Sequence, residues 1–132
     1  MEINLDNNSL IGVAALLVHA SKIDDNYTEK EKNLILKFIS SIKKSDNEIK
    51  EILKKAELLE SNSNQLLDFT NIIKKNSLEI KTMIVKEMWK IIISDNKSDE
   101  YESNLMRRVC GLIYFPDKLS GEIKNQLKEN KV

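Results

Sequence analysis

The sequence predicts an all-α fold of about seven helices in a single domain, residues 1–132. Apolar residues recur at helical spacing along most of the chain. Only 3 Gly and 1 Pro interrupt it, so tight turns have few of the residues that they prefer. The chain also contains two similar halves, which we expect to form a duplicated three-helix repeat with pseudo-two-fold symmetry, roughly residues 9–59 and 78–129.

The first half carries the patterns of three helices. The first is expected over residues 9–21. Thr28 then forms a capping box with Glu31 and opens the second helix, and a similar box that starts at Ser45 opens the third. Each helix has apolar residues at helical spacing: Leu10, Val13, Ala14 and Leu17 in the first; Ile35, Phe38, Ile39 and Ile42 in the second; Ile49, Ile52, Leu53, Ala56 and Leu59 in the third.

A polar loop at residues 61–64 and a short fourth helix connect the halves, and three more helices follow. Ser77 caps a fifth helix that is apolar on most sides, which is typical of a central helix. Asp99 and Glu102 form a capping box that opens the sixth helix, and Pro116 precedes the last. The apolar positions of the last four helices include Leu66, Phe69, Ile72 and Ile73; Ile80, Ile84, Met88, Trp89 and Ile91; Leu105, Met106, Val109, Cys110 and Ile113; Leu119, Ile123 and Leu127.

The two halves align with each other when the second is displaced by 71 residues. Each then shows a helix, an acidic turn and a second helix, with Asp24 matching Asp95 and Glu31 matching Glu102. Several other positions are identical at this displacement: Asn33 and Asn104, Leu34 and Leu105, Ile42 and Ile113, Asp46 and Asp117, Ile52 and Ile123. We interpret the pattern as an internal duplication, with the fourth helix as the connector.

Composition excludes several classes of function. The 21 basic and 21 acidic side chains cancel and are interleaved, whereas a dedicated nucleic-acid binder is more basic, so we expect no nucleic-acid partner. The start, residues 1–6, is acidic, and the apolar run at residues 11–20 is too short to span a bilayer. The single cysteine, Cys110, fits a reducing compartment and lies on a core stripe as an inert small hydrophobe. We therefore expect a soluble cytoplasmic protein without a transmembrane segment.

The acidic turns are the candidate metal site. Asp24, Glu31, Asp95 and Glu102 supply oxygen ligands of the kind that Ca²⁺ or Mg²⁺ prefers. Their spacing is not that of an EF-hand loop. Capping accounts for the two Glu residues without any metal, and an Asx-turn would account for each Asp. If the two repeats pack symmetrically, the turns could instead pool Asp24 and Asp95 in one acidic site.

Other reactive or charged residues have plain structural interpretations. His19 could be a ligand or a general base, but no nucleophile is placed near it by sequence, so we interpret it as a surface or packing residue. Lys50, Lys54 and Lys55 are interleaved with Glu residues, which is typical of a solvated helix face. No catalytic constellation is apparent, and we do not predict an enzyme.

Residues 14–31 and 88–102 resemble the paired helix, Asp-Gly turn, helix signatures of the TerB-like tellurite-resistance family. The resemblance implies an all-helical, duplicated fold, related to a region of a membrane-anchored DnaJ-type co-chaperone, with an acidic surface proposed to bind metal. By this resemblance the family's Asp residues fall on Asp24 and Asp95, and its Glu residues on Glu31 and Glu102. The glycine after each Asp is replaced by Asp25 and Asn96, residue types that tolerate a left-handed backbone.

The function that we predict is a non-enzymatic cytoplasmic interaction module of the TerB-like type, linked by resemblance to tellurite resistance or stress response. A protein partner is expected, and Ca²⁺ or Mg²⁺ is the candidate cofactor. The alternative is a metal-free helical adaptor, or a protein-interaction domain like that of a co-chaperone.

Overall fold

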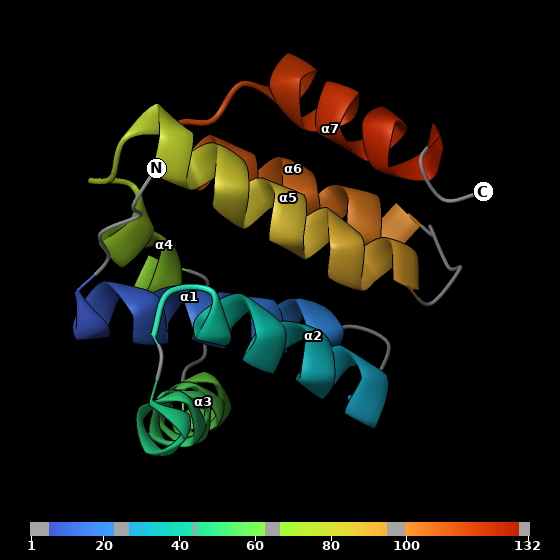
Figure 1. Ribbon diagram of the computed structural model, residues 1–132. Coiled ribbons are helices and arrows are strands. Elements are labelled where there is room, and N and C mark those ends of the chain that lie inside the picture. Colours follow the sequence, from blue (N-terminus) through green and yellow to red (C-terminus); the bar gives the residue numbers. More distant parts are fainter. Residues whose placement is uncertain (1–5, 23–26, 44, 63–66, 95–99, 130–132) are drawn as a thin grey trace.

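A computed structural model describes residues 6–22, 27–43, 45–62, 67–94 and 100–129. All regular structure within these residues is helical, so the predicted all-α fold is confirmed (Figure 1). The seven helices of this part of the chain are α1 (Asn7–Ser21), α2 (Glu29–Ser40), α3 (Asp46–Asn62), α4 (Leu67–Ile73), α5 (Leu78–Ser94), α6 (Glu100–Leu112) and α7 (Asp117–Glu129).

Side-chain caps set the starts of three helices. The carboxylate of Asp6 accepts a hydrogen bond from the backbone N–H of Ser9 at 2.7 Å, so α1 begins two residues earlier than predicted. The predicted capping box of Thr28 and Glu31 opens α2. The hydroxyl of Ser77 accepts a backbone N–H from the first turn of α5 at 3.3 Å, which confirms that cap as well. The predicted cap of α6 at Asp99 lies outside the described residues.

Helix α1 is buried on all its sides rather than along one stripe. Every side chain from Val13 to Val18 is fully buried, because α2, α3, α4 and α5 all contact this helix. The four positions predicted to be apolar, Leu10, Val13, Ala14 and Leu17, are all buried, and burial extends to the residues between them, as is typical of an enclosed helix. None of the helices within the described ranges is both long and apolar enough to cross a membrane.

Helix α5 is central, as its sequence predicted. It contacts α1 and α2 of the first half, and α6 and α7 of the second. Figure 1 shows α7 covering α5 and α6 at one end of the molecule, while α3, seen end-on, lies against α1 and α2 at the opposite end. Helix α3 is thus an outer element, and none of the other described helices covers its far side.

The order of the helices follows the displacement seen in the sequence. Helices α1, α2 and α3 begin at residues 7, 29 and 46, and α5, α6 and α7 begin at residues 78, 100 and 117, each 71 residues later. In each half the first helix contacts the second and the third. The symmetry that would relate the halves, and the boundaries of the repeats, remain predictions.

Candidate functional site

Only one of the four predicted cation ligands has a described side chain. Asp24 and Asp95 lie outside the described residues, and Glu102 lies in α6 with its side chain outside them. Among the side chains that are described, no three or more His, Cys, Asp or Glu residues gather as a set of cation ligands. The predicted cation site therefore remains a prediction.

The fourth predicted ligand, Glu31, takes part in the capping box of α2. Its side chain is only 1% exposed. One carboxylate oxygen, Oε1, accepts hydrogen bonds from the backbone N–H of Thr28 at 2.9 Å and from its hydroxyl at 3.0 Å. The Thr28 hydroxyl in turn accepts the backbone N–H of Glu31 at 3.2 Å. Capping thus gives Glu31 a structural role in the first turn of α2, where the helix dipole also favours a carboxylate.

A polar network joins the end of α1 to α3. The Glu60 carboxylate lies 2.7 Å from Nζ of Lys22 and 3.2 Å from Nδ1 of His19. Burial is the largest single influence on the pKa of Glu60 and acts to raise it, because it favours the neutral acid. The hydrogen bonds from Lys22 and His19, together with the charges of these two residues, outweigh burial, so the pKa of Glu60 is lowered. The His19 ring also lies 6.2 Å from the ring of Phe69, so this histidine is a packing residue, as interpreted from the sequence.

A second polar contact lies on the other side of residues 23–26. The hydroxyl of Tyr27 donates to the carboxylate of Glu57 on α3 at 2.9 Å. Burial and this hydrogen bond raise the pKa of Tyr27, so the phenol stays neutral. Lys22 and Tyr27 flank residues 23–26, and both contact α3. Helix α3 therefore contacts the chain on both sides of these residues, an arrangement that sequence spacing does not reveal.

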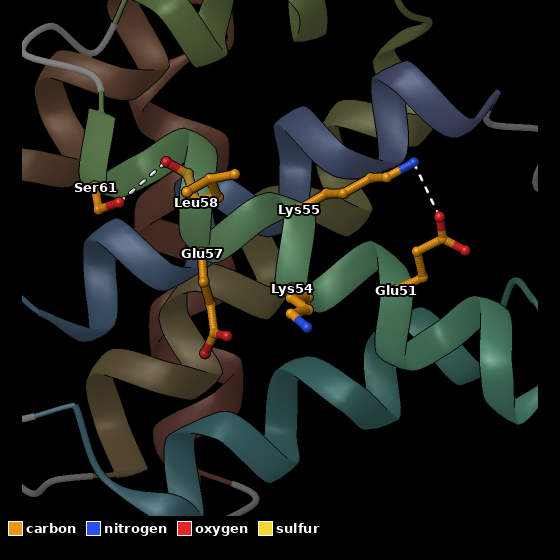
Figure 2. A pocket seen from close by; sticks show the side chains of 6 residues that line it. All are labelled: Glu51, Lys54, Lys55, Glu57, Leu58 and Ser61. Carbon is orange, nitrogen blue, oxygen red and sulfur yellow. Dashed lines mark hydrogen bonds and ion pairs between the residues drawn. The ribbon is translucent and has the colours of Figure 1, made fainter.

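The outer side of α3 carries a shallow hollow of about 540 Å³. Figure 2 shows its six lining side chains, which all belong to α3. We call this surface the α3 face; its residues are Glu51, Lys54, Lys55, Glu57, Leu58 and Ser61. Leu58 is 62% exposed, and Lys55 pairs with Glu51 at 3.1 Å, as the spacing of these two residues predicted. In Figure 2, Lys54 and Glu57 point away from this pair, toward α2.

A second hollow, of about 390 Å³, lies between α2 and α3. We call it the α2–α3 groove; its residues are Lys32, Leu36, Lys50, Leu53, Lys54 and Glu57. Leu53, only 3% exposed, forms part of an apolar floor, and three lysines stand around it. The groove and the α3 face share Lys54 and Glu57, so the two hollows form one continuous surface.

The third hollow, of about 240 Å³, lies among α5, α6 and α7. Nε1 of Trp89 donates to the Ser120 hydroxyl at 2.9 Å, and Nζ of Lys124 lies 4.9 Å from the centre of the Trp89 ring. Cys110 is fully buried nearby; burial raises the pKa of its thiol, against a smaller opposing effect of a hydrogen bond with Ser120. A buried, protonated thiol is a poor nucleophile, which supports the interpretation of Cys110 as a core residue.

Comparison with known proteins identifies one family. The family model described as "Tellurite resistance protein TerB" matches residues 10–125, which include nearly all of the seven described helices. Neither the curated proteins nor the solved structures gave a match to this chain.

Proposed function

The chain belongs to the TerB family of tellurite resistance proteins, and from this premise we propose that it is a non-enzymatic module that binds a protein partner through α3. The proposed link to tellurite resistance rests on membership of this family. We also propose that the protein is located in the cytoplasm, because a chain with a single cysteine suits a reducing compartment.

The observation that carries this proposal is the continuity of the α3 face with the α2–α3 groove. Together they present the exposed Leu58 and the partly buried Leu36 beside charged side chains, on a helix whose outer side no other described helix covers. Apolar positions set among polar ones in a hollow are typical of a protein-binding surface. A binding role also fits the chemistry of the described residues, since Cys110 is buried and His19 is engaged with Glu60.

In-cell photo-crosslinking tests the proposal. A photoreactive amino acid would replace Leu58 on the α3 face, and in a control protein it would replace Glu122, an exposed residue of α7. We expect discrete adducts of higher mass from position 58 and none of the same mass from position 122. No adduct at position 58, or the same adducts from both positions, would contradict the proposal.

We further propose that a divalent cation, Ca²⁺ or Mg²⁺, stabilises the module through Asp24 and Asp95, with Glu31 and Glu102 beside them. The support is the sequence pattern, because each Asp precedes the capped helix and capping does not require it. Glu31 already has a structural role in its capping box, so the two Asp residues are the ones to test.

Thermal and urea unfolding with chelator and with each cation tests this second proposal. A cation at about 100 times its dissociation constant adds roughly 2.7 kcal/mol to the free energy of unfolding. The double replacement Asp24→Asn and Asp95→Asn should remove that gain, since Asn can keep an Asx-turn but supplies no charge. If chelator and cations give identical melting of the wild type, the metal-free adaptor is the better description.

A further inference from the structure

The α2–α3 groove is a hollow with an apolar floor. Its volume of about 390 Å³ falls within the usual range of ligand pockets. The side chains of Leu36 and Leu53 supply apolar surface from the two facing helices. Because Leu53 is almost fully buried, this apolar surface is recessed below the charged side chains around it.

Three cations surround that apolar surface. Lys32 comes from α2, and Lys50 and Lys54 come from α3. We call them the groove lysines. Within the part of the chain that the structure describes, no ion pair joins any of them to a carboxylate. The one acidic residue of the groove, Glu57, accepts a hydrogen bond from Tyr27. The groove therefore offers a net positive charge to whatever binds there.

The adjoining α3 face extends this surface along the helix. There, Glu51 and Lys55 neutralise each other, and Leu58 gives a second apolar position beyond the groove. A ligand that reaches both positions must be elongated. An amphipathic peptide, with apolar side chains on one face and acidic ones beside them, has this form.

The other half of the chain lacks the same combination. The hollow among α5, α6 and α7 has Arg107 and Lys124 at the positions that lie 71 residues after Leu36 and Leu53. Charged side chains thus replace the apolar floor, and Lys124 lies over the ring of Trp89. Of these two corresponding hollows, the one between α2 and α3 is therefore the one with an apolar floor.

We propose that the α2–α3 groove and the α3 face bind an acidic amphipathic segment of a partner protein, which inserts an apolar side chain between the groove lysines. This inference rests on the proposed function and gives the chemistry of the partner. Anionic lipid is the less suitable occupant, because the apolar floor is recessed and a flat membrane surface would meet the lysines first. Complementary charge speeds association and orients the segment, while the apolar anchor supplies most of the affinity.

Fluorescence anisotropy with a synthetic probe tests the proposal. The probe is a labelled peptide of glutamate and leucine, with leucine at helical spacing. We expect saturable binding to the wild type that weakens as salt concentration rises. Binding should be lost when lysine replaces the glutamates of the probe, and should weaken when glutamine replaces its leucines.

Matched protein variants assign the binding to the groove. The groove variant carries Lys32→Glu, Lys50→Glu and Lys54→Glu, and a milder form carries Gln at the same three positions. The control variant reverses three exposed lysines elsewhere, namely Lys75, Lys86 and Lys118, so its net charge is the same. We expect the charge reversal in the groove to weaken probe binding about tenfold or more, and the Gln form to weaken it less. The control variant should bind the probe with an affinity within about twofold of that of the wild type. Circular dichroism melting checks that all three variants are folded.

Four results would overturn the inference. The first two are no saturable binding of the probe by the wild type, and equal loss of probe binding in the groove and control variants. The other two are groove-dependent binding of phosphatidylserine vesicles in place of the peptide, and groove-dependent self-association in sedimentation without peptide binding. The crosslinking test separates this failure from that of the proposed function. Adducts at position 58 with no binding of the acidic probe would leave the module in place and reject only the chemistry of its partner.

Discussion

The indole N–H of Trp89 donates a hydrogen bond to the hydroxyl of Ser120 at 2.9 Å, and this bond fastens α7 to the central helix α5. Both side chains are buried. Removing the acceptor therefore leaves a polar N–H group without this partner in the interior. Such a group costs more than a lost surface hydrogen bond, because a buried polar group left without its partner bears the cost of its desolvation.

We predict that Ser120→Ala lowers the free energy of unfolding by about 1–3 kcal/mol. Ser40→Ala is the control, since the Ser40 hydroxyl is exposed and donates only to a carbonyl of its own helix. Urea unfolding followed by the fluorescence of Trp89, the only tryptophan, measures both variants. Equal stability of Ser120→Ala and the wild type would show that this bond does not hold α7 in place.

Replacement by alanine should lower the stability at one of the three glycines and raise it at the other two. A Cβ at Gly12 would lie 2.9 Å from Cδ1 and 3.3 Å from Cβ of Ile72, so α1 and α4 would have to separate slightly. We expect Gly12→Ala to destabilise the protein by about 1–3 kcal/mol. Gly111 and Gly121 have open space at this position and lie within helices, so alanine there should stabilise by about 0.5–1 kcal/mol. Thermal melting of the three variants measures these changes in stability. Stabilisation by Gly12→Ala would contradict the close packing of α1 on α4.

The capping box of α2 can be tested against a threonine inside a helix. Thr28→Ala removes the hydroxyl that accepts the backbone N–H of Glu31, and we expect a loss of about 0.5–2 kcal/mol in metal-free buffer. Thr82→Ala is the control, because its hydroxyl donates to a carbonyl of its own helix and alanine is the better helix former. If chemical denaturation shows the same small change in both variants, the capping account of this turn is wrong.

The network around Glu60 predicts a dependence of stability on pH. Its pKa is lowered in the folded protein, so its ionised form stabilises the fold above the ordinary carboxyl pKa of about 4.3 and this stabilisation is lost as pH falls below that value. Glu60→Gln should therefore be less stable than the wild type at neutral pH, and the difference should shrink in acid. Glu122→Gln, at an exposed position on α7, should follow the wild type throughout. A constant difference between Glu60→Gln and the wild type from neutral to acid pH would argue against this network.

The helices and the caps at Thr28 and Ser77 could be predicted from the sequence because they depend on near neighbours. Thr28 and Glu31 are three residues apart, and the α2 capping box follows from that spacing alone. The early start of α1 was missed, although Asp6 three residues before Ser9 carried its signal. The enclosure of α1 could not be predicted from the spacing of its apolar residues, because it depends on how four other helices pack around it.

The candidate binding surface was not predicted because it is assembled from two helices. Sequence alone placed Lys50 and Lys54 on a solvated face, balanced by neighbouring glutamates. Folding instead brings Lys32 of α2 to the same groove, while Glu51 pairs with Lys55 and Glu57 with Tyr27. The positive charge of the groove is thus a property of tertiary packing. The predicted cation ligands Asp24, Asp95 and Glu102 depend on side chains outside the described residues and are left to the melting experiment.

The central claim is that a protein partner binds the surface formed by α2 and α3 through the groove lysines, and crosslinking in charge variants tests it most directly. The photoreactive residue at position 58 would be placed in the wild type, in the variant with all three groove lysines reversed, and in the control variant with Lys75, Lys86 and Lys118 reversed. At equal protein levels, we expect the adducts to disappear from the groove variant and to persist in the control, because only the first loses the charges around the binding surface. Adducts of equal yield in all three proteins would contradict the claim.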